Sequence, residues 1–535
     1  MARILNIVFR YADVQHPEAK FDRAAHHALA AELEKECAVL LQNKGALPLA
    51  RAAKIAYIGG FAEKPRYQGG GSSHINASAV ASALDAARVN GTDVVYAEGF
   101  PADRDETDEA KFAAAVEAAR AADAAIIFAG LPDSFESEGY DRSHMRLPEC
   151  QDRLIARVAA VQPNTVVVLH NGSPVECPWA ESVNAVLEMY LGGQGVGAAA
   201  DALLYGDANP SGRLPETFPN QLEDNPSHLN FPGDGKNVEY AEGVFVGYRY
   251  YDKKKMAVRW PFGHGLSYTT FEYSNVRVSA DVLNDGSTVT VYADIKNTGD
   301  RAGREVVQLY VADRTGTAGR PEKELKGFAK VFLAPGESRT VSIALDDKAF
   351  RYWNVKTDRW EVEGGSYQLR VGASSADIRL TAEVSVKGTD APDPYEGLDL
   401  LHYVSGQITY VTDAEFEALL GHPVPEDVVR IDRNMTLGEM DHGRSPLGWV
   451  AQKVLRCRLD SSFAKGTPDL NTVFQYNMPL RALAKMTNGM VSMGMVDGLV
   501  WELKGFWLVG ILRVIYEFVK NLILNSQMEN RLKNS

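Results

Sequence analysis

Charged residues gather in one short stretch of the sequence, FESEGYDRSHMRLP, which runs from Phe135 to Pro148. Within it, Glu136, Glu138 and Asp141 can donate and accept protons, and Arg142 is near enough to hold one carboxylate ionised. A less solvated carboxyl group beside that pair would keep its proton and act as an acid toward a leaving group. The alternative is a solvated loop in which Arg142 pairs with Asp141 and no chemistry occurs.

Short apolar runs predict the strands that position this stretch. The runs are KIAYIGGF, DVVYAEGF, AAIIFAGL, NTVVVLH and NAVLEMYL. Helix-patterned segments such as DEAKFAAAVEAARAAD separate them, which favours a mostly parallel sheet between layers of helices. The charged stretch directly follows AAIIFAGL, and ligands of such sheets bind at the carboxyl ends of the strands. The sequence therefore predicts a functional site at this edge of the sheet.

The pattern changes twice on either side of this sheet. Before it, HHALAAELEKECAVLLQN, from His26 to Asn43, has the spacing of a helix. After a loop rich in Pro, Asn and Asp, period-two runs such as STVTVYADIKNTG and GREVVQLYVAD predict a β-sandwich of the immunoglobulin or fibronectin kind. From Asp390 onward the chain turns helical, and charged residues interrupt its last apolar segment before it reaches the ~20 residues of a membrane span. We expect a buried helix pair or an oligomer contact there.

Composition excludes several classes of function. The 535 residues are 45% hydrophobic, enough for several cores, and the formal net charge of −14 argues against nucleic-acid binding. Cys37, Cys150, Cys177 and Cys457 are far apart and form no CxxC pair, so we expect reduced core thiols and a cytoplasmic protein. The histidines have no metal-ligand spacing, and GxSxG and HExxH motifs are absent from the sequence. We expect neither a metal nor a cofactor.

Five separate motifs carry a resemblance to a known family. They are QGGGSSHIN, ESEGYDRSHMRLP, YLGGQGVGAAADALLYGDANPSGRLPETFP, AEGVFVGYRYYD and WPFGHGLSYTTF. In this order they resemble the part of glycoside hydrolase family 3, in its β-glucosidase branch, that follows the N-terminal (β/α) barrel. The resemblance extends from about Asp22 to Val386, and FEALLGHPVP and RNMTLGEM look like the C-terminal extension of some bacterial members.

The resemblance implies roles for several residues. Glu138, in the EGYDR motif, is expected to be the general acid/base of a retaining glycosidase, with Glu136 as the reserve candidate. Tyr140, Asp141 and Arg142 are then supports of the loop. The glycine loop with Gly70, Gly71, Ser72 and Ser73 lacks the lysine of a P-loop, so we expect it to line the rim of the sugar site.

The family's nucleophile, an aspartate in an SDW-like or TDW-like motif on a barrel strand, has no counterpart in this sequence. Met1 to Ala19 looks like the closing helix of that barrel and its linker. The interpretation divides the chain into the end of a barrel helix with a linker helix (1–49), an α/β sandwich domain (50–222), a fibronectin type III-like sandwich with its leading loop (223–388) and a helical extension (389–535). We expect this chain to need a barrel domain for activity.

Glu136 and Glu138 cannot replace the missing pair by themselves. In an extended segment they would point the same way about 6.6 Å apart, whereas a retaining glycosidase needs two carboxyl groups that flank the bond. We therefore expect the acid/base part of a β-glucosidase that acts on terminal β-D-glucosyl residues of short oligosaccharides or aryl glucosides. The alternative is a non-catalytic module for carbohydrate binding or oligomerisation, and the apolar tail makes a homodimer plausible. An independent hydrolase of another class has no supporting motif.

Overall fold

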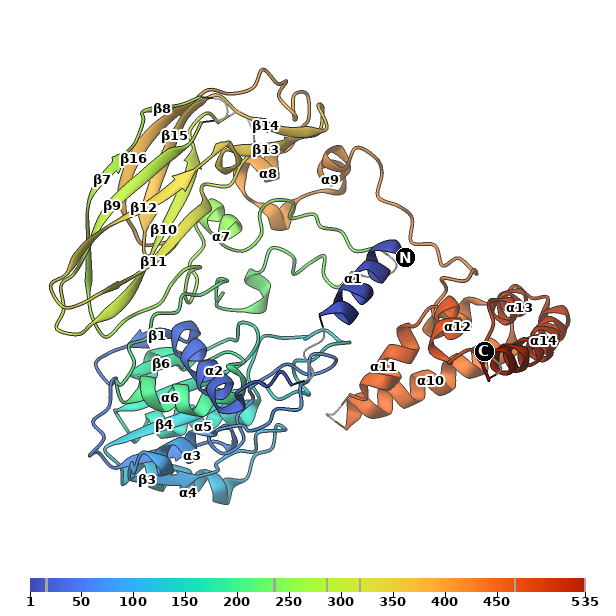
Figure 1. Cartoon of the computed structure of the whole chain (residues 1–535), viewed down its shortest axis with the longest axis horizontal. Helices are drawn as coiled ribbons and strands as arrows, with labels where there is room; N and C mark the ends of the chain where they lie inside the picture. Colours follow the sequence, from blue (N-terminus) through green and yellow to red (C-terminus); the bar gives the residue numbers. More distant parts are fainter. Residues whose placement is uncertain (15–17, 234–236, 285–286, 317–318, 466–467, 534–535) are drawn as a thin grey trace.

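The computed structural model describes residues 1–14, 18–233, 237–284, 287–316, 319–465 and 468–533. Figure 1 shows an α/β domain, a β-sandwich and a helical tail that follow one another along the chain. Two further helices, α1 (Ala2–Asp13) and α7 (Tyr248–Lys254), lie outside these layers. The predicted succession of an α/β domain, a fibronectin-like sandwich and a helical extension is confirmed.

The α/β domain is built on one six-stranded sheet. Its strands are β1 (Val39–Asn43), β2 (Ile55–Ile58), β3 (Val94–Ala97), β4 (Ala124–Gly130), β5 (Thr165–His170) and β6 (Ala185–Glu188). They lie in the order β1-β6-β5-β4-β2-β3, and only β1 pairs in the antiparallel direction. Because β2, β4, β5 and β6 are buried along their whole lengths, both faces of the sheet must be covered.

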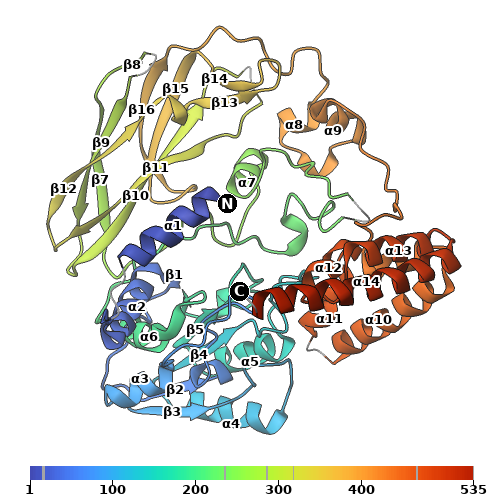
Figure 2. The ribbon, with the colours of Figure 1, turned by 45° about the vertical axis from the view of Figure 1, so that its right-hand side comes forward.

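Two groups of helices supply that cover. They are α4 (Glu109–Arg120) with α5 (Glu149–Ala159), and α2 (Arg23–Cys37) with α3 (Ala83–Val89) and α6 (Val196–Leu204). Figure 2 shows them on opposite sides of the sheet. This arrangement leaves the carboxyl ends of β2, β4, β5 and β6 at one edge, where their following loops meet.

The first strand corrects one sequence prediction. The helix expected from His26 to Asn43 ends at Cys37, and Val39 to Asn43 form β1 instead. The run AVLL is fully buried, and its backbone pairs with β6. A short apolar run cannot be assigned to a helix or a strand by its periodicity. Here the hydrogen-bonded pairing with β6 at the edge of the sheet selects the strand.

The β-sandwich consists of two sheets and a hairpin, and its strands pair in the antiparallel direction except for β8, which is parallel to β16. One sheet has the order β11-β10-β15-β16-β8, the other has the order β12-β9-β7, and β13 pairs with β14. The strands are β7 (Phe271–Val278), β8 (Val282–Leu283), β9 (Val289–Asn297), β10 (Gly303–Asp313), β11 (Glu324–Leu333), β12 (Ser338–Leu345), β13 (Arg351–Asn354), β14 (Arg359–Val362), β15 (Gly365–Gly372) and β16 (Ile378–Val386). A buried ion pair between Arg213 and Glu305, 3.0 Å long, ties this sandwich to the α/β domain.

The tail is helical, as predicted. Its helices are α8 (Leu401–Ser405), α9 (Asp413–Leu420), α10 (Pro446–Ala464), α11 (Leu470–Asn477), α12 (Leu483–Met486), α13 (Met493–Leu503) and α14 (Trp507–Lys533). Helices α13 and α14 pair with each other, but only Gly510 and Glu517 of α14 are buried, so the expectation of a buried helix pair is wrong for α14. None of the described helices is long and apolar enough to cross a membrane.

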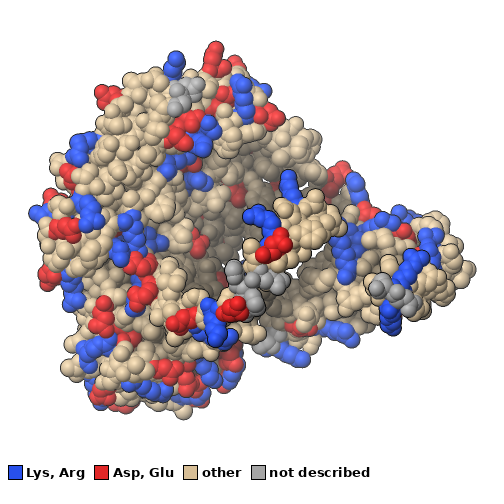
Figure 3. Space-filling model, viewed as in Figure 1, with Lys and Arg blue, Asp and Glu red and all other residues tan. Residues whose placement is uncertain are grey.

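The cysteines are all free, but they are not all in cores. Cys150 and Cys177 are buried, as expected, whereas Cys37 and Cys457 are exposed. Figure 3 shows Lys and Arg side chains interspersed with Asp and Glu side chains over the visible faces of the α/β domain and the sandwich.

Candidate active site

The charged stretch folds into a turn at the carboxyl end of β4. The backbone N–H groups of Phe135 and Glu136 both donate to the carbonyl oxygen of Pro132, which closes the turn. The segment is therefore not extended, and the expectation that Glu136 and Glu138 point the same way is wrong. Their carboxylates turn to different partners, one toward the loop after β5 and the other toward the glycine loop.

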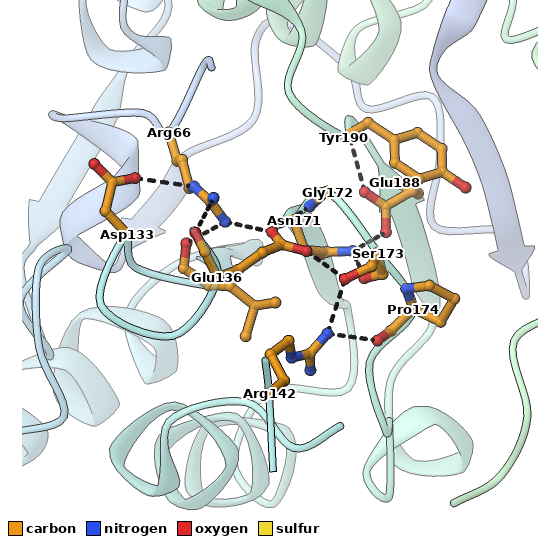
Figure 4. A network of polar contacts seen from close by, with 12 residues as sticks. Arg66, Asp133, Glu136, Arg142, Asn171, Gly172, Ser173, Pro174, Glu188 and Tyr190 are labelled. Carbon is orange, nitrogen blue, oxygen red and sulfur yellow. Dashed lines mark hydrogen bonds and ion pairs between the residues drawn. The ribbon is translucent and has the colours of Figure 1, made fainter. Parts of the chain in front are cut away.

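Glu136 is held on several sides by the protein itself. Its Oε2 accepts hydrogen bonds from Arg66 Nη1 at 2.6 Å and from the N–H of Gly172 at 2.8 Å, while its Oε1 accepts one from the hydroxyl of Ser173. Arg66 also donates to the backbone oxygen of Glu136 and forms an ion pair with Asp133 (Figure 4). Because the side chain of Arg66 is only 5% exposed, this is a buried link between three loops at the sheet edge.

Glu138 is exposed and has a different kind of support. Its Oε2 accepts a hydrogen bond from the backbone N–H of Ser72 at 2.6 Å. Hydrogen bonding by the side chain of Ser72 and by its backbone N–H lowers the pKa of the Glu138 carboxyl group, because it favours the ionised form. A carboxylate that projects from a short turn and is oriented by one neighbouring residue can serve as a proton carrier once a substrate and a second carboxylate surround it.

The glycine loop packs directly against the turn, so the predicted neighbourhood is present. Gly70 forms a parallel β-bridge with Ser137, and a Cβ on Gly70 would come 2.6 Å from the Ser137 hydroxyl. Gly71 has a φ of +90°, and a Cβ there would come 2.5 Å from the Cβ of Glu138. The loop needs glycine here because a side chain would occupy the space of the turn. Ser73 is exposed and lies against Gly69.

Of the residues expected to support the loop, Tyr140 and Arg142 form hydrogen bonds that hold it, whereas Asp141 is exposed. Tyr140 is half-buried and donates from its hydroxyl to the backbone oxygen of Asp133 at 2.6 Å. Arg142 donates to the Ser173 hydroxyl at 2.9 Å and to the oxygen of Pro174 at 3.1 Å, and burial lowers its pKa. Asp141 is exposed, and Arg142 is occupied by the loop after β5 rather than by an isolated pair with Asp141.

Several polar residues of this edge were missed by the sequence analysis. Glu188 ends β6, is fully buried, and accepts hydrogen bonds from the Asn171 amide at 3.0 Å and from the Tyr190 N–H at 2.7 Å (Figure 4). Burial raises its pKa well above the ordinary value. Two features of the sequence could have indicated these residues. One is the acidic residue inside the apolar run NAVLEMYL, and the other is Arg66, a charged residue four positions before Gly70.

An open cleft lies beside this network. Its volume is about 870 Å³, and it is lined by Glu136, Arg142 and Ser173 together with residues from the loops that lead to the sandwich, such as Glu216. Burial raises the pKa of Glu216 to about 7, with a smaller contribution from the charge of Glu136. Within the described ranges, no group of three or more His, Cys, Asp or Glu side chains is arranged to hold a metal ion.

Comparisons with known proteins agree with this architecture. Residues 38–268 match the glycosyl hydrolase family 3 C-terminal domain, and residues 305–375 match a fibronectin type III-like domain. Thermostable beta-glucosidase B of Acetivibrio thermocellus is 50% identical over 391 residues, which are 72% of this chain and 52% of that protein. An exo-alpha-(1->6)-L-arabinopyranosidase of Bifidobacterium breve is 45% identical over 386 residues, 70% of this chain and 51% of that protein.

Solved structures give the same result. The crystal structure of a GH3 beta-glucosidase from Bifidobacterium adolescentis is similar with a TM-score of 0.68 and 42% identity, over 74% of this chain and 59% of that one. The chain spans about half the length of the curated relatives it matches. It belongs to glycoside hydrolase family 3, and it carries the C-terminal α/β domain and the fibronectin type III-like domain of that family.

Proposed function

We propose that this chain supplies the general acid/base of a retaining β-glucosidase, and that Glu138 is that residue. The observation that carries the proposal is the contrast between two glutamates on one turn. Glu136 is committed to Arg66, Gly172 and Ser173, whereas Glu138 is exposed and is oriented by Ser72. Of these two glutamates, Glu138 is therefore the one whose carboxyl group remains available to a substrate.

The proposed reaction needs a second carboxylate from outside these residues. A retaining glycosidase places its nucleophile about 5 Å from the acid and on the other side of the bond, which Glu136 cannot reach from its network. We propose that a (β/α) barrel supplies this nucleophile and the pocket for a terminal β-D-glucosyl residue. Helix α1, which buries none of its residues and exposes Ile4, Ile7 and Phe9, supports contact with such a partner.

The lowered pKa of Glu138 is consistent with an acid/base on this chain and a nucleophile on a separate barrel. A solvated, ionised carboxyl group is a poor acid at neutral pH, so the group needs a change of surroundings before it can protonate a leaving group. Loss of solvent and a nearby nucleophile carboxylate both raise the pKa of a carboxyl group. Closure against a barrel would provide both changes at once.

The test supplies the chain with the separately purified barrel of a family 3 relative and measures hydrolysis of cellobiose and of an activated aryl β-glucoside. We expect Glu138→Gln to abolish most turnover of cellobiose, because its leaving group needs protonation, and to largely spare cleavage of the aryl glucoside. Equal losses on both substrates would contradict the assignment. Turnover by the chain alone that disappears in Glu138→Ala would place a nucleophile within these residues and contradict the need for a barrel.

The sugar and the location are further proposals. A β-glucoside or short oligosaccharide is favoured by the beta-glucosidase relatives, and an α-L-arabinopyranoside should be assayed beside it because two relatives are named as arabinopyranosidases. The four free cysteines support a reducing compartment, the cytoplasm.

A second candidate function is homodimer formation through α14. Its residues Leu508, Leu512, Ile515, Val519 and Leu522 are separated by four, three, four and three positions, and each is more than half exposed. This is the seam spacing of a coiled coil. The stripe lies opposite the face with Gly510 and Glu517 that packs on α13, so a second copy of α14 could cover it without displacing α13.

A further inference from the structure

The helical tail contains a pocket of its own. It has a volume of about 250 Å³ and is lined by residues of α10, α13 and α14 and of two short 3-10 helices, Leu437–His442 and Leu480–Ala482. Figures 1 and 2 show α10, α13 and α14 together in the last part of the chain, drawn orange to red. Leu447 of α10 and Ile515 of α14 are more than half exposed, so solvent reaches the pocket beside them. None of the described residues that line this pocket also lines the cleft beside Glu136.

The walls of the tail pocket are apolar. Apart from Glu502, the described residues that line it are Leu, Ile, Met, Val, Ala and Gly. Gly448 allows α10 to approach α13 closely, because a Cβ on it would come 2.4 Å from Cδ2 of Leu503. Protein interiors rarely leave a void of this size, and a dry apolar cavity of about 150 Å³ already accepts a benzene ring. The tail pocket therefore has room for a substituted six-membered ring.

One carboxyl group lies among these apolar walls. Glu502 is only 5% exposed, and its Oε1 accepts a hydrogen bond from the hydroxyl of Ser445. The Ser445 oxygen in turn accepts the N–H of Gly448 at 3.1 Å, so its own donor and acceptor are both in use. The second carboxyl oxygen of Glu502, Oε2, forms no hydrogen bond or ion pair with a described residue. A buried acceptor without a donor is costly, so a donor on a bound molecule would stabilise it.

This lining disfavours a sugar and favours a compact apolar molecule. A monosaccharide carries several hydroxyl groups that would lose water on binding, and one carboxyl oxygen cannot satisfy them all. A small ring with a single hydroxyl or amino group matches both the aliphatic walls and the one free acceptor. The ligand class therefore differs from the substrate class proposed for the turn that carries Glu138.

We propose that the tail pocket binds a compact apolar molecule with one hydrogen-bond donor, such as a phenol. The ring lies among the aliphatic side chains, and the donor binds Oε2 of Glu502. A molecule in this position contacts α10, α13 and α14 at once, so it also stabilises the packing of α14 on the rest of the tail. The inference goes beyond the proposed function and does not depend on the role of Glu138.

The test titrates the whole chain with p-cresol and with toluene, which have nearly the same shape and differ by one hydroxyl group. Calorimetry measures the affinities, and the methyl NMR signals of Ile511 and Ile515 report the place of binding. Both probes should shift these signals, and p-cresol should bind about tenfold more tightly, because only p-cresol can donate to Glu502. In Glu502→Gln this difference should largely disappear while toluene binds as before, since Ser445 can also donate to the glutamine oxygen.

A second variant keeps the test independent of Glu502. Ala451→Phe, at an exposed position of the lining, should abolish the signal shifts caused by both probes, because the new ring occupies the pocket. Ala464→Phe is the matched control, since Ala464 is exposed on the same helix outside the lining. Failure of the parent to bind either probe, equal affinities for the two probes, or unchanged binding in Ala451→Phe would overturn the proposal. Binding that weakens as the protein concentration rises would show that a second copy fills the pocket, and would overturn it as well.

Discussion

Gly71 lies so close to Glu138 that a Cβ on the glycine would come 2.5 Å from the Cβ of the glutamate. Real Cβ atoms do not approach this closely, so the turn and the glycine loop fit together only without that side chain. The backbone φ of +90° at Gly71 adds a second reason for glycine. The position of the acid is thus set by the neighbouring loop as much as by its own turn.

Gly71→Ala should displace Glu138 and destabilise the α/β domain by about 1–3 kcal/mol through overpacking and backbone strain. Urea unfolding followed by circular dichroism measures this change. Gly45→Ala is a matched control, because Gly45 has a φ of +91° with no atom within 4 Å of an added Cβ. Equal destabilisation by both substitutions would show that the clash with Glu138 contributes nothing.

Removal of the buried cation beside Glu136 should destabilise the protein. Arg66→Met leaves Glu136 without its buried cation, and we expect a loss of about 3–5 kcal/mol in the free energy of unfolding. In Arg66→Met combined with Glu136→Gln, part of this loss should be recovered, because the uncompensated charge is removed as well. A double-mutant cycle measures the coupling.

Glu138→Gln is the matched control on the same turn. We expect it to leave thermal unfolding nearly unchanged, because Glu138 is exposed and Ser72 can also donate to the glutamine oxygen. A larger destabilisation by Glu138→Gln than by Glu136→Gln would contradict the proposal, because it would give Glu138 the structural role that is proposed for Glu136.

The sequence was informative where patterns are local. Period and composition predicted the parallel strands β2 to β6, the sandwich and the helical tail, because each depends on neighbouring residues. The motif around Glu138 predicted a loop at a strand end and its glycine neighbours. By contrast, the pattern predicts helix for β1, because the short run AVLL fits both periods and only pairing with β6 selects the strand.

The contacts of the site were harder to predict. Arg66 and Glu136 are 70 positions apart, and the tail residue Phe463 reaches Tyr140 from the far end of the chain. Such pairings depend on how loops and domains assemble, which hydrophobic periodicity does not encode. The opposite orientations of Glu136 and Glu138 likewise follow from a turn closed at Pro132, where the sequence suggested an extended segment.

The buried Glu34 should make stability depend on pH. Its side chain on α2 lies under Gly192, the residue is 7% exposed, and burial raises its pKa to about 8. As pH rises from about 4.5 toward 8, the unfolded chain releases this proton while the native protein keeps it, so stability falls. We expect a loss on the order of 3 kcal/mol across this window.

Glu34→Gln should remove this loss, and the variant should exceed the parent in unfolding free energy at pH 8 but not at pH 4.5. Glu32→Gln is the control, since it removes an exposed carboxylate from the same helix. Parallel pH profiles for the parent and Glu34→Gln would show that Glu34 is ionised in the native protein. Urea unfolding at pH 4.5, 6 and 8 distinguishes the outcomes.

The exposed stripe of α14 predicts a dimer that a few charges would disrupt. In Ile515→Glu with Val519→Glu, two carboxylates enter the middle of the stripe, where a second α14 would have to bury them unpaired. Size-exclusion chromatography with light scattering should show twice 58.5 kDa for the parent and 58.5 kDa for the variant. Val89→Glu, at a highly exposed position on α3, should stay dimeric. A parent that is monomeric at tens of micromolar would refute the dimer, and binding of the parent to lipid vesicles that is lost in the variant would assign the stripe to a membrane surface.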